Sequence, residues 1–234
     1  MTEPRPVRLA IHQPNYIPWL GYFAKMAESD IFVYLDAVQY PRGQSFSPRN
    51  RIKTPNGPAF LTIPVDKSAA VDGKLTYRQV GFSGDKWRAK HLKTVEMSYK
   101  RAPYFEAVFE RFRTVLEREE SFVDLNIALI DMVVDYLGID VQRVRLSEIL
   151  DDFGQKSDLI VDCCRKMGAT EYLSGTGGGK DYNDEAVLAA AGIALRYSRF
   201  AHPEYPQLWG EFVSHLSVLD ALFNCGPATR DLLP

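Results

Sequence analysis

A histidine, two amides and a tyrosine lie close together near the start of the chain, in the segment His12–Phe23. Because an imidazole takes up and releases protons near neutral pH, His12 is a candidate general acid or base, and we group Tyr16 with it. The amides of Gln13 and Asn15 would bind a substrate beside the start of a predicted helix, where anions are stabilised. Alternatively, these residues cap a turn by satisfying its backbone groups.

Basic residues are concentrated in the segment 36–58, which begins with a further candidate catalytic residue, Asp36. Prolines and glycines predict that this segment is a long loop, and long loops within compact domains are often functional. Arginine side chains match the geometry of phosphate and carboxylate groups, so we expect a phosphate-bearing small-molecule substrate to bind here. A solvated charged loop is the alternative. The candidate binding residues are Arg49, Asn50, Arg51 and Lys53, with Arg42 in the same basic cluster.

A run of glycines follows a strand predicted at residues 170–173. Its candidate substrate-binding residues are Ser174, Gly175, Thr176 and Gly177. Glycines after a strand allow backbone N–H groups to approach a phosphate closely. However, the run lacks the G-x-G-x-x-G spacing of dinucleotide-binding folds, and Asp181 follows Lys180 where a P-loop would have Ser or Thr. We therefore predict no cofactor, and a flexible turn is the alternative.

The segment His202–Gln207 contains two prolines that fix an extended path for the chain. This path would hold His202, a further candidate catalytic residue, towards a ligand. It would do the same for Tyr205 and Gln207, which are candidate substrate-binding residues. His202 with Glu204 or Asp220 would form an acid–base pair. A rigid connector between the last strand and the last helix is the alternative.

Alternating strands and helices must position these residues, and they predict a single α/β domain over residues 1–234. We expect a mixed, mainly parallel sheet with flanking helices and a helical C-terminal half. A strand at 8–11, a helix at 18–28 and a strand at 31–35 form a βαβ unit. An N-terminal α/β lobe at 1–82 and a helical insertion at 83–140 are compatible with the pattern. Further strands are predicted at 59–65, 78–80, 141–146, 170–173 and 194–198, and further helices at 86–99, 104–119, 122–137, 157–167, 184–191 and 211–223.

The predicted strands end at polar residues. The first ends at His12, the second at Asp36, a later one at Ser174, and the last close to His202. Because ligands of parallel sheets bind at the carboxyl ends of the strands, we expect these residues to converge on one cavity.

The composition excludes several classes of protein. Hydrophobic residues make up 46% of the 234 residues and charged residues 25%, which argues against disorder, and no apolar stretch is long enough to span a membrane. A net charge of −2 provides no overall field for nucleic acid. Three cysteines without regular spacing predict neither a disulfide framework nor a zinc site. We expect no leader peptide and a cytoplasmic protein, and a homo-oligomer is compatible with the sequence.

Several of these segments, in order along nearly the whole chain, resemble the WbqC-like protein family. The segments that carry the resemblance are His12–Phe23, Ser47–Lys53, Tyr172–Gly177, His202–Gln207, Leu216–Asp220 and Phe223–Gly226. The resemblance implies a role in the biosynthesis of O-antigen, other surface polysaccharides or natural products.

Taken together, the residues predict a group-transfer enzyme, and the resemblance implies that it moves an acyl or aminoacyl group to an amino sugar or a related amine. His12 or His202 would remove a proton from the amine. One alternative is a non-catalytic protein that binds a nucleotide-linked sugar or glycan precursor. Another is a degenerate relative of the nucleotidyltransferases with an H-x-G-H signature, in which Tyr22 occupies the position of the second histidine.

Overall fold

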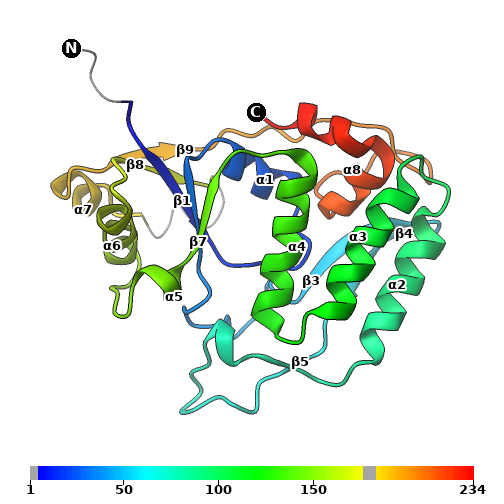
Figure 1. Cartoon of the computed structure of the whole chain (residues 1–234), viewed down its shortest axis with the longest axis horizontal. Coiled ribbons are helices and arrows are strands. Elements are labelled where there is room, and N and C mark those ends of the chain that lie inside the picture. Colours follow the sequence, from blue (N-terminus) through cyan, green and yellow to red (C-terminus); the bar gives the residue numbers. More distant parts are fainter. Residues whose placement is uncertain (1–4, 176–182) are drawn as a thin grey trace.

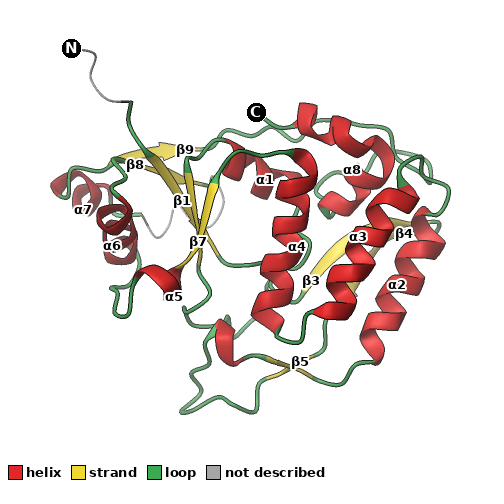
Figure 2. Ribbon diagram, in the orientation of Figure 1, coloured by secondary structure: helices red, strands yellow, loops and turns green. Residues whose placement is uncertain are grey.

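The computed structural model describes residues 5–175 and 183–234 of the chain. Its centre is a five-stranded parallel sheet with the strand order β7-β2-β1-β8-β9 (Figures 1 and 2). This sheet confirms the predicted α/β class. The strands of the sheet are β1 (Arg8–His12), β2 (Ile31–Tyr34), β7 (Gln142–Arg145), β8 (Glu171–Ser174) and β9 (Ala194–Tyr197).

The order of the strands reverses between β1 and β8. From β1 the chain moves outward through β2 to β7, and then returns to place β8 and β9 on the other side of β1. Leu9 in β1 therefore pairs with Ile31 of β2 on one side and with Tyr172 of β8 on the other. In open parallel sheets, ligands bind outside the carboxyl ends of the strands at such a reversal.

Successive residues of β1 face two separate hydrophobic cores, because side chains alternate along a strand. Leu9 and Ile11 belong to the core under α6 and α7. Ala10 belongs to the core that contains α1 and α4, which lie on the opposite side of the sheet (Figure 1). Helices therefore flank both faces. The flanking helices are α1 (Leu20–Ala27), α4 (Phe122–Leu137), α5 (Leu146–Ile149), α6 (Ser157–Met167) and α7 (Glu185–Ala190).

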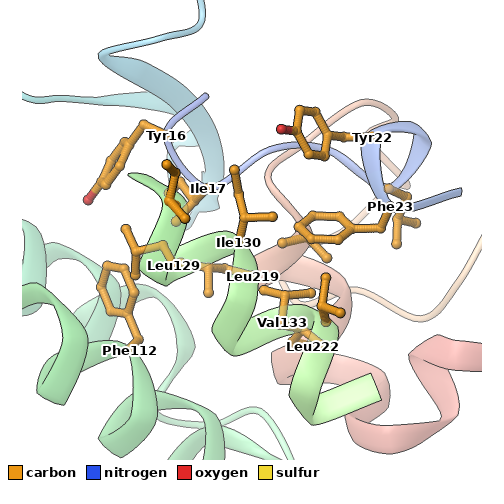
Figure 3. Packing of buried hydrophobic residues seen from close by; sticks show 14 of the residues in the cluster. Tyr16, Ile17, Tyr22, Phe23, Phe112, Leu129, Ile130, Val133, Leu219 and Leu222 are labelled. Carbon is orange, nitrogen blue, oxygen red and sulfur yellow. The ribbon is translucent and has the colours of Figure 1, made fainter. Parts of the chain in front are cut away.

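A helical region packs beside the sheet and includes α2, α3, α4 and α8 (Figure 2). Its apolar side chains meet those around α1, as Figure 3 shows for Phe112, Ile130, Leu219 and Phe23. The helices predicted at 86–99, 104–119 and 122–137 are confirmed. Among the residues described, no helix is both long enough and apolar enough to cross a bilayer. The remaining helices are α2 (Lys86–Tyr99), α3 (Phe105–Arg118) and α8 (Val218–Cys225), followed by a 3-10 helix at Gly226–Leu232.

The predicted loop at 36–58 is wrong in its second half, because β3 (Arg49–Thr54) and β4 (Gly57–Thr62) form an antiparallel hairpin there. Asn50 and Ile52 are buried on one side of β3. Strand periodicity is therefore present, but the basic residues between them obscured it. Gly57, with φ of 99°, completes the tight turn around Pro55 and Asn56.

Two other predictions near the chain's turns are corrected by the structure. Residues 77–79 form a 3-10 helix instead of the strand predicted at 78–80, because Thr76 and Gln79 cap each other's backbone. A short strand β5 (Val65–Asp66) pairs instead with β6 (Gly81–Phe82). The last helix begins at Val218, not at 211, and Ser217 caps its start.

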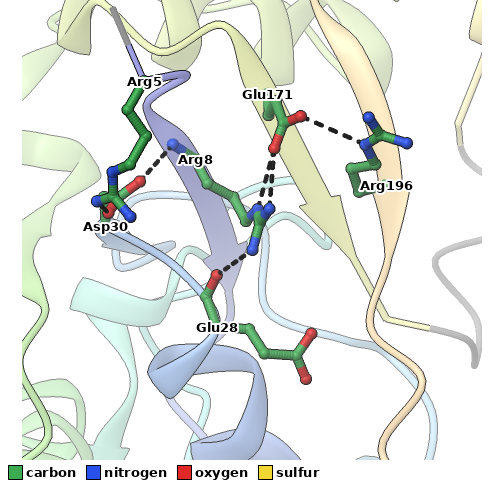
Figure 4. Close-up of polar contacts among 6 residues, drawn as sticks. All are labelled: Arg5, Arg8, Glu28, Asp30, Glu171 and Arg196. Atoms are coloured by element: carbon green, nitrogen blue, oxygen red, sulfur yellow. Dashed lines mark hydrogen bonds and ion pairs between the residues drawn. The ribbon is translucent and has the colours of Figure 1, made fainter. Parts of the chain in front are cut away.

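The amino ends of the strands carry a network of ion pairs (Figure 4). Arg8 at the start of β1 donates to the carboxylate of Glu171 at the start of β8, at 3.1 Å, and Arg196 donates to the same carboxylate at 3.3 Å. Asp30, just before β2, pairs with Arg5 and accepts a hydrogen bond from the backbone N–H of Arg8. Acidic and basic groups therefore neutralise one another at this end of the sheet.

Candidate functional site

A cavity of about 1080 Å³ lies at the carboxyl ends of β1 and β8, where the strand order reverses. Its walls come from the loop after β1, from α1, from the start of α6 and from the segment after β9. The polar side chains along these walls include His12, Gln13, Lys25, Arg42, Gln155, Lys156, Ser174, Asn183, Ser198, His202 and His215. The structure thus brings together parts of the N-terminal and C-terminal segments that the sequence marks out.

His12 is the last residue of β1, so the strand delivers its ring directly to the cavity. Its Nδ1 lies 3.0 Å from the carbonyl oxygen of Gln13, which can only accept, so this nitrogen carries the proton. Among the described residues, Nε2 has no hydrogen-bond partner, and its lone pair is available to a ligand. Burial and the nearby charge of Lys25 lower the pKa of His12 to about 3. The ring is therefore neutral at physiological pH.

His202 lies on the wall of the same cavity but is held differently. Its Nδ1 donates to the carbonyl of Pro203 at 3.0 Å, and its Nε2 accepts from the backbone N–H of His215 at 3.3 Å. Both ring nitrogens are therefore engaged within the protein. Burial lowers the pKa of His202, so this ring is also neutral at physiological pH.

Ser174 ends β8, the neighbour of β1, and is buried at the cavity wall. Its Oγ donates to the carbonyl of Gly175 at 3.2 Å and accepts from the side-chain amide of Asn183 at 2.9 Å. Gly175 also lines the cavity. The predicted binding residues Thr176 and Gly177 lie outside the described residues.

Lys25 on α1 is a cavity residue that the sequence reasoning missed. It is only 6% exposed, and its Nζ donates to the backbone carbonyl of Ile11 at 2.9 Å. Burial lowers its pKa to about 7. A signal was present, because Lys25 is the one charged residue in a helix that otherwise reads Leu-Gly-Tyr-Phe-Ala-Met-Ala.

The described cavity lining has an unbalanced charge. Lys25, Arg42 and Lys156 are basic, whereas no aspartate or glutamate is among the described lining residues. The chain as a whole has slightly more acidic than basic residues, 30 against 28. The positive charge is therefore local, and it suits the binding of an anionic ligand. Arg42 belongs to the basic cluster noted in the sequence.

Several predicted catalytic and binding residues are not among the described residues that line the cavity. Tyr16 is fully buried, and its hydroxyl is 2.9 Å from Nδ1 of His91. Asn15 accepts from the hydroxyl of Ser47 at 3.4 Å. Asp36 is also fully buried, and its carboxylate accepts from the backbone and hydroxyl of Ser147 at 3.0 and 2.6 Å. These contacts connect elements of the fold.

The predicted basic binding residues of β3 also lie outside the described cavity lining. Asn50 donates to the carbonyl of Ile17, and the guanidinium of Arg49 stacks over the ring of Phe60 at 4.8 Å. The backbone carbonyl of Arg51 accepts from the N–H of Ser217. The hairpin thus joins the loop after β1 to the residues before α8, and none of its predicted binding residues is in the described lining.

Lys53, Tyr205 and Gln207 meet in a second, closed polar cluster. Nζ of Lys53 donates to Oε1 of Gln207 at 3.1 Å and to the carbonyl of Glu211 at 2.5 Å. Burial, and after it the nearby carboxylate of Asp220, raise the pKa of the Tyr205 phenol. The lysine therefore fastens the segment after His202 to the hairpin.

Comparisons with known proteins agree with the sequence resemblance. The model of the WbqC-like protein family matches residues 13–232. The uncharacterized protein Rv1507c of Mycobacterium tuberculosis is 33% identical over 229 residues, which cover 97% of each chain. The match includes both the loop after β1 and the segment after β9, so both walls of the cavity lie inside the shared region.

Proposed function

The chain belongs to the WbqC-like protein family, and we propose that it is a group-transfer enzyme that acts in the cavity at the carboxyl ends of β1 and β8. The donor carries phosphate, and an acyl or aminoacyl group moves from it to an amino sugar or a related amine. The pathway is the biosynthesis of a surface polysaccharide or a natural product.

The observation that carries this proposal is the charge of the cavity. Lys25, Arg42 and Lys156 line it, and the described lining contains no carboxylate. The cavity also lies at the reversal of strand order, where parallel sheets bind ligands. An anionic donor is stabilised by such a site, because its phosphates supply the charge that the protein lacks.

His12 is the residue best placed to move a proton. The amine nitrogen attacks the acyl carbon, a nitrogen–carbon bond forms, and the bond from that carbon to the leaving group breaks. Nε2 of His12 accepts the proton released by the amine and passes it to the leaving group. The negative charge of a bound phosphate raises the pKa of His12 from the low value of the empty cavity, which makes the ring a better base.

Amide and hydroxyl groups of the cavity would bind the acceptor substrate, the amino sugar. Gln13, Asn183 and Ser198 line the cavity and offer both donors and acceptors for the hydroxyl groups of a sugar. Trp19 and Phe200 are aromatic lining residues against which a sugar or base packs.

The test is to incubate purified protein with nucleotide-linked amino sugars and with acyl or aminoacyl donors, and to follow products by mass spectrometry. His12→Asn keeps a donor for the Gln13 carbonyl but removes the Nε2 lone pair, so we expect kcat to fall about 100-fold. His202→Asn is the matched variant, and we expect less than about a tenfold loss because both nitrogens of His202 already bind protein groups.

Two results would count against the proposal. A His12→Asn protein with undiminished turnover removes His12 from the reaction. Ligands that raise the melting temperature without any product, across all donors, indicate a binding protein for a nucleotide-linked sugar instead.

A second function is favoured by the strand order. A parallel sheet that reverses beside β1, with a histidine directly after that strand, also suits nucleotidyl transfer. In that reaction a phosphate oxygen of a sugar phosphate attacks the α-phosphorus of a nucleoside triphosphate, and pyrophosphate leaves. Release of pyrophosphate that depends on His12 would favour this function over acyl transfer.

A further inference from the structure

Lys25 is a buried lysine whose charge has no acidic partner among the described residues. The side chain is 6% exposed, lies on α1 and lines the cavity. Its Nζ donates to the carbonyl of Ile11 at 2.9 Å and lies 5.7 Å from the centre of the Phe32 ring. A carbonyl and a ring face satisfy only part of an ammonium group, which has three donors.

Among the described residues, the groups that face Lys25 come from β1, β2 and the end of α1. From β1 comes His12, which is neutral, and from β2 comes the ring of Phe32. On α1's own C-terminal end, the carboxylate of Glu28 accepts from the hydroxyl of Ser198 at 2.9 Å, and no ion pair joins it to Lys25. Thus the described protein surrounds this amine without neutralising it.

A buried ammonium without a counter-ion is unfavourable, so such a group either loses its proton or acquires an anion. Burial lowers the pKa of Lys25 to about 7, so in the empty cavity the amine is divided between both forms near neutral pH. An apolar residue would fill the same place on an otherwise apolar helix without this difficulty. The lysine is therefore explained by an anion that arrives with the ligand.

We propose that Lys25 binds an anionic group of the ligand, a phosphate or a carboxylate, at the inner end of the cavity, and that this binding takes up a proton. The position is inner because Lys25 is buried, whereas the other lining cations, Arg42 and Lys156, are exposed. The inference deepens the proposed function, since it assigns the place of the donor's or acceptor's charge within the same cavity.

The proton uptake has a definite sign. A bound anion stabilises the charged amine and raises the pKa of Lys25 above its value in the empty cavity. Above pH 7, binding therefore takes up as much as one proton, and affinity falls by up to about tenfold for each further pH unit. Below pH 7 the amine is already charged, and affinity is independent of this group.

The experiment uses two doubly charged anions, sulfate as a stand-in for phosphate and malonate as a carboxylate. Binding to the full-length protein is measured by calorimetry between pH 6 and 9, in two buffers with different ionisation enthalpies. For the wild type we expect proton uptake near pH 8 and a fall in affinity above pH 7. The anion that shows the stronger effect identifies the ligand's charged group as phosphate-like or carboxylate-like.

Three variants separate binding from structure. Lys25→Met should abolish binding of the preferred anion and leave the melting temperature of the empty protein equal or higher, because a buried charge has been removed. Lys25→Arg should retain binding without proton uptake, since an arginine stays charged throughout. Lys156→Met should weaken binding but retain the proton uptake.

The inference is overturned if Lys25→Met binds both anions as the wild type does, or if wild-type binding takes up no proton at pH 8. It is also overturned if Lys25→Met lowers the melting temperature by several degrees and Lys25→Arg does not bind. Anion binding that depends on Lys25 without any group transfer would support this inference while the proposed reaction fails. If Lys25→Met still catalyses group transfer and binds the anions as the wild type does, the proposed reaction is supported and this inference fails.

Discussion

The two ends of the central sheet differ in whether their charged side chains have partners within the protein. At the amino ends of β1 and β8, the carboxylates of Asp30 and Glu171 pair with Arg5, Arg8 and Arg196 (Figure 4). At the carboxyl ends, cations line a cavity whose described residues include no carboxylate. The acidic and basic side chains are therefore paired at the amino ends of these strands, whereas the basic side chains at the carboxyl ends have no acidic partner in the described lining.

This difference distinguishes a structural charge from a functional one. A charge that only stabilises the fold is expected to have its partner within the chain, as Glu171 does. A buried cation that lacks such a partner, as Lys25 does among the described residues, needs another source of negative charge. Three substitutions, two of them with matched controls, test this difference.

An acidic residue introduced into the cavity should have the largest effect. Gln13→Glu places a carboxylate among the lining cations, where it competes with a bound anion. We expect the affinity for the preferred anion to fall by about 3 kcal/mol, on the order of 100-fold. Calorimetry with sulfate and malonate measures it.

Gln142→Glu is the matched control, because it adds the same charge at the exposed start of β7, at the other end of the sheet. Its anion binding should equal that of the wild type. Equal losses in both variants would show that overall charge, and not the cavity, governs binding.

Removal of the carboxylate at the amino ends should affect stability instead. Glu171 is only 7% exposed, and Glu171→Gln leaves Arg8 and Arg196 without their anionic partner. We expect the free energy of unfolding to fall by about 2 kcal/mol in urea titrations, with anion affinity unchanged.

The exposed pair of Glu110 and Arg113 provides the control for this change. Glu110→Gln should leave the free energy of unfolding within error of the wild type, because solvent screens an exposed pair. If Glu171→Gln behaves in the same way, the network at the amino ends does not stabilise the sheet.

Acid should reveal the cavity histidine through the pH dependence of stability. The folded-state pKa of His12 is about 3, below the ordinary value of 6.5, so between these values the unfolded chain binds a proton that the folded protein does not. Stability therefore falls as the pH drops from 6.5 towards 3. His12→Asn should lose about 1.4 kcal/mol less per pH unit in this range than the wild type.

Urea titrations at pH 7, 5.5 and 4.5 measure this slope. His91, in the closed core beside Tyr16, has its pKa lowered to about 4 by burial, and it contributes to the slope of both proteins. Identical slopes for the wild type and His12→Asn would mean that His12 is accessible to solvent protons in the folded state.

Much of the fold could be predicted from the sequence because its signals are local. The continuous apolar run at Ile31–Tyr34 reads as a buried parallel strand, and the three long helices show clear helical spacing. The hairpin at β3 could not be predicted in this way, because its basic residues mask the buried positions Asn50 and Ile52. Residues 211–217 of the predicted last helix are not helical, because His215 has a positive φ of 58° and the N–H of Ser217 bonds the carbonyl of Arg51.

The position of the candidate site could be predicted from the sequence, but several of the residues that line it could not. The rule for strand ends places His12 and Ser174 together because it depends only on parallel order. Lys25 was missed because exposure of a helical lysine is the usual outcome, and only tertiary packing buries it. Lys53 shows the converse, since a basic residue in a motif turned out to bind carbonyl groups inside the protein.

The backbone contacts between the first and last parts of the chain affect when the protein acquires its cavity during synthesis. Trp19 pairs with Ser217, and the carbonyl of Pro18 accepts from the N–H of Val218. A nascent chain on the ribosome can form β1, β2 and β7 in turn, but the wall with His202 and His215 is translated last. A product that terminates before His202 lacks that wall of the cavity, and we expect it to bind no ligand there.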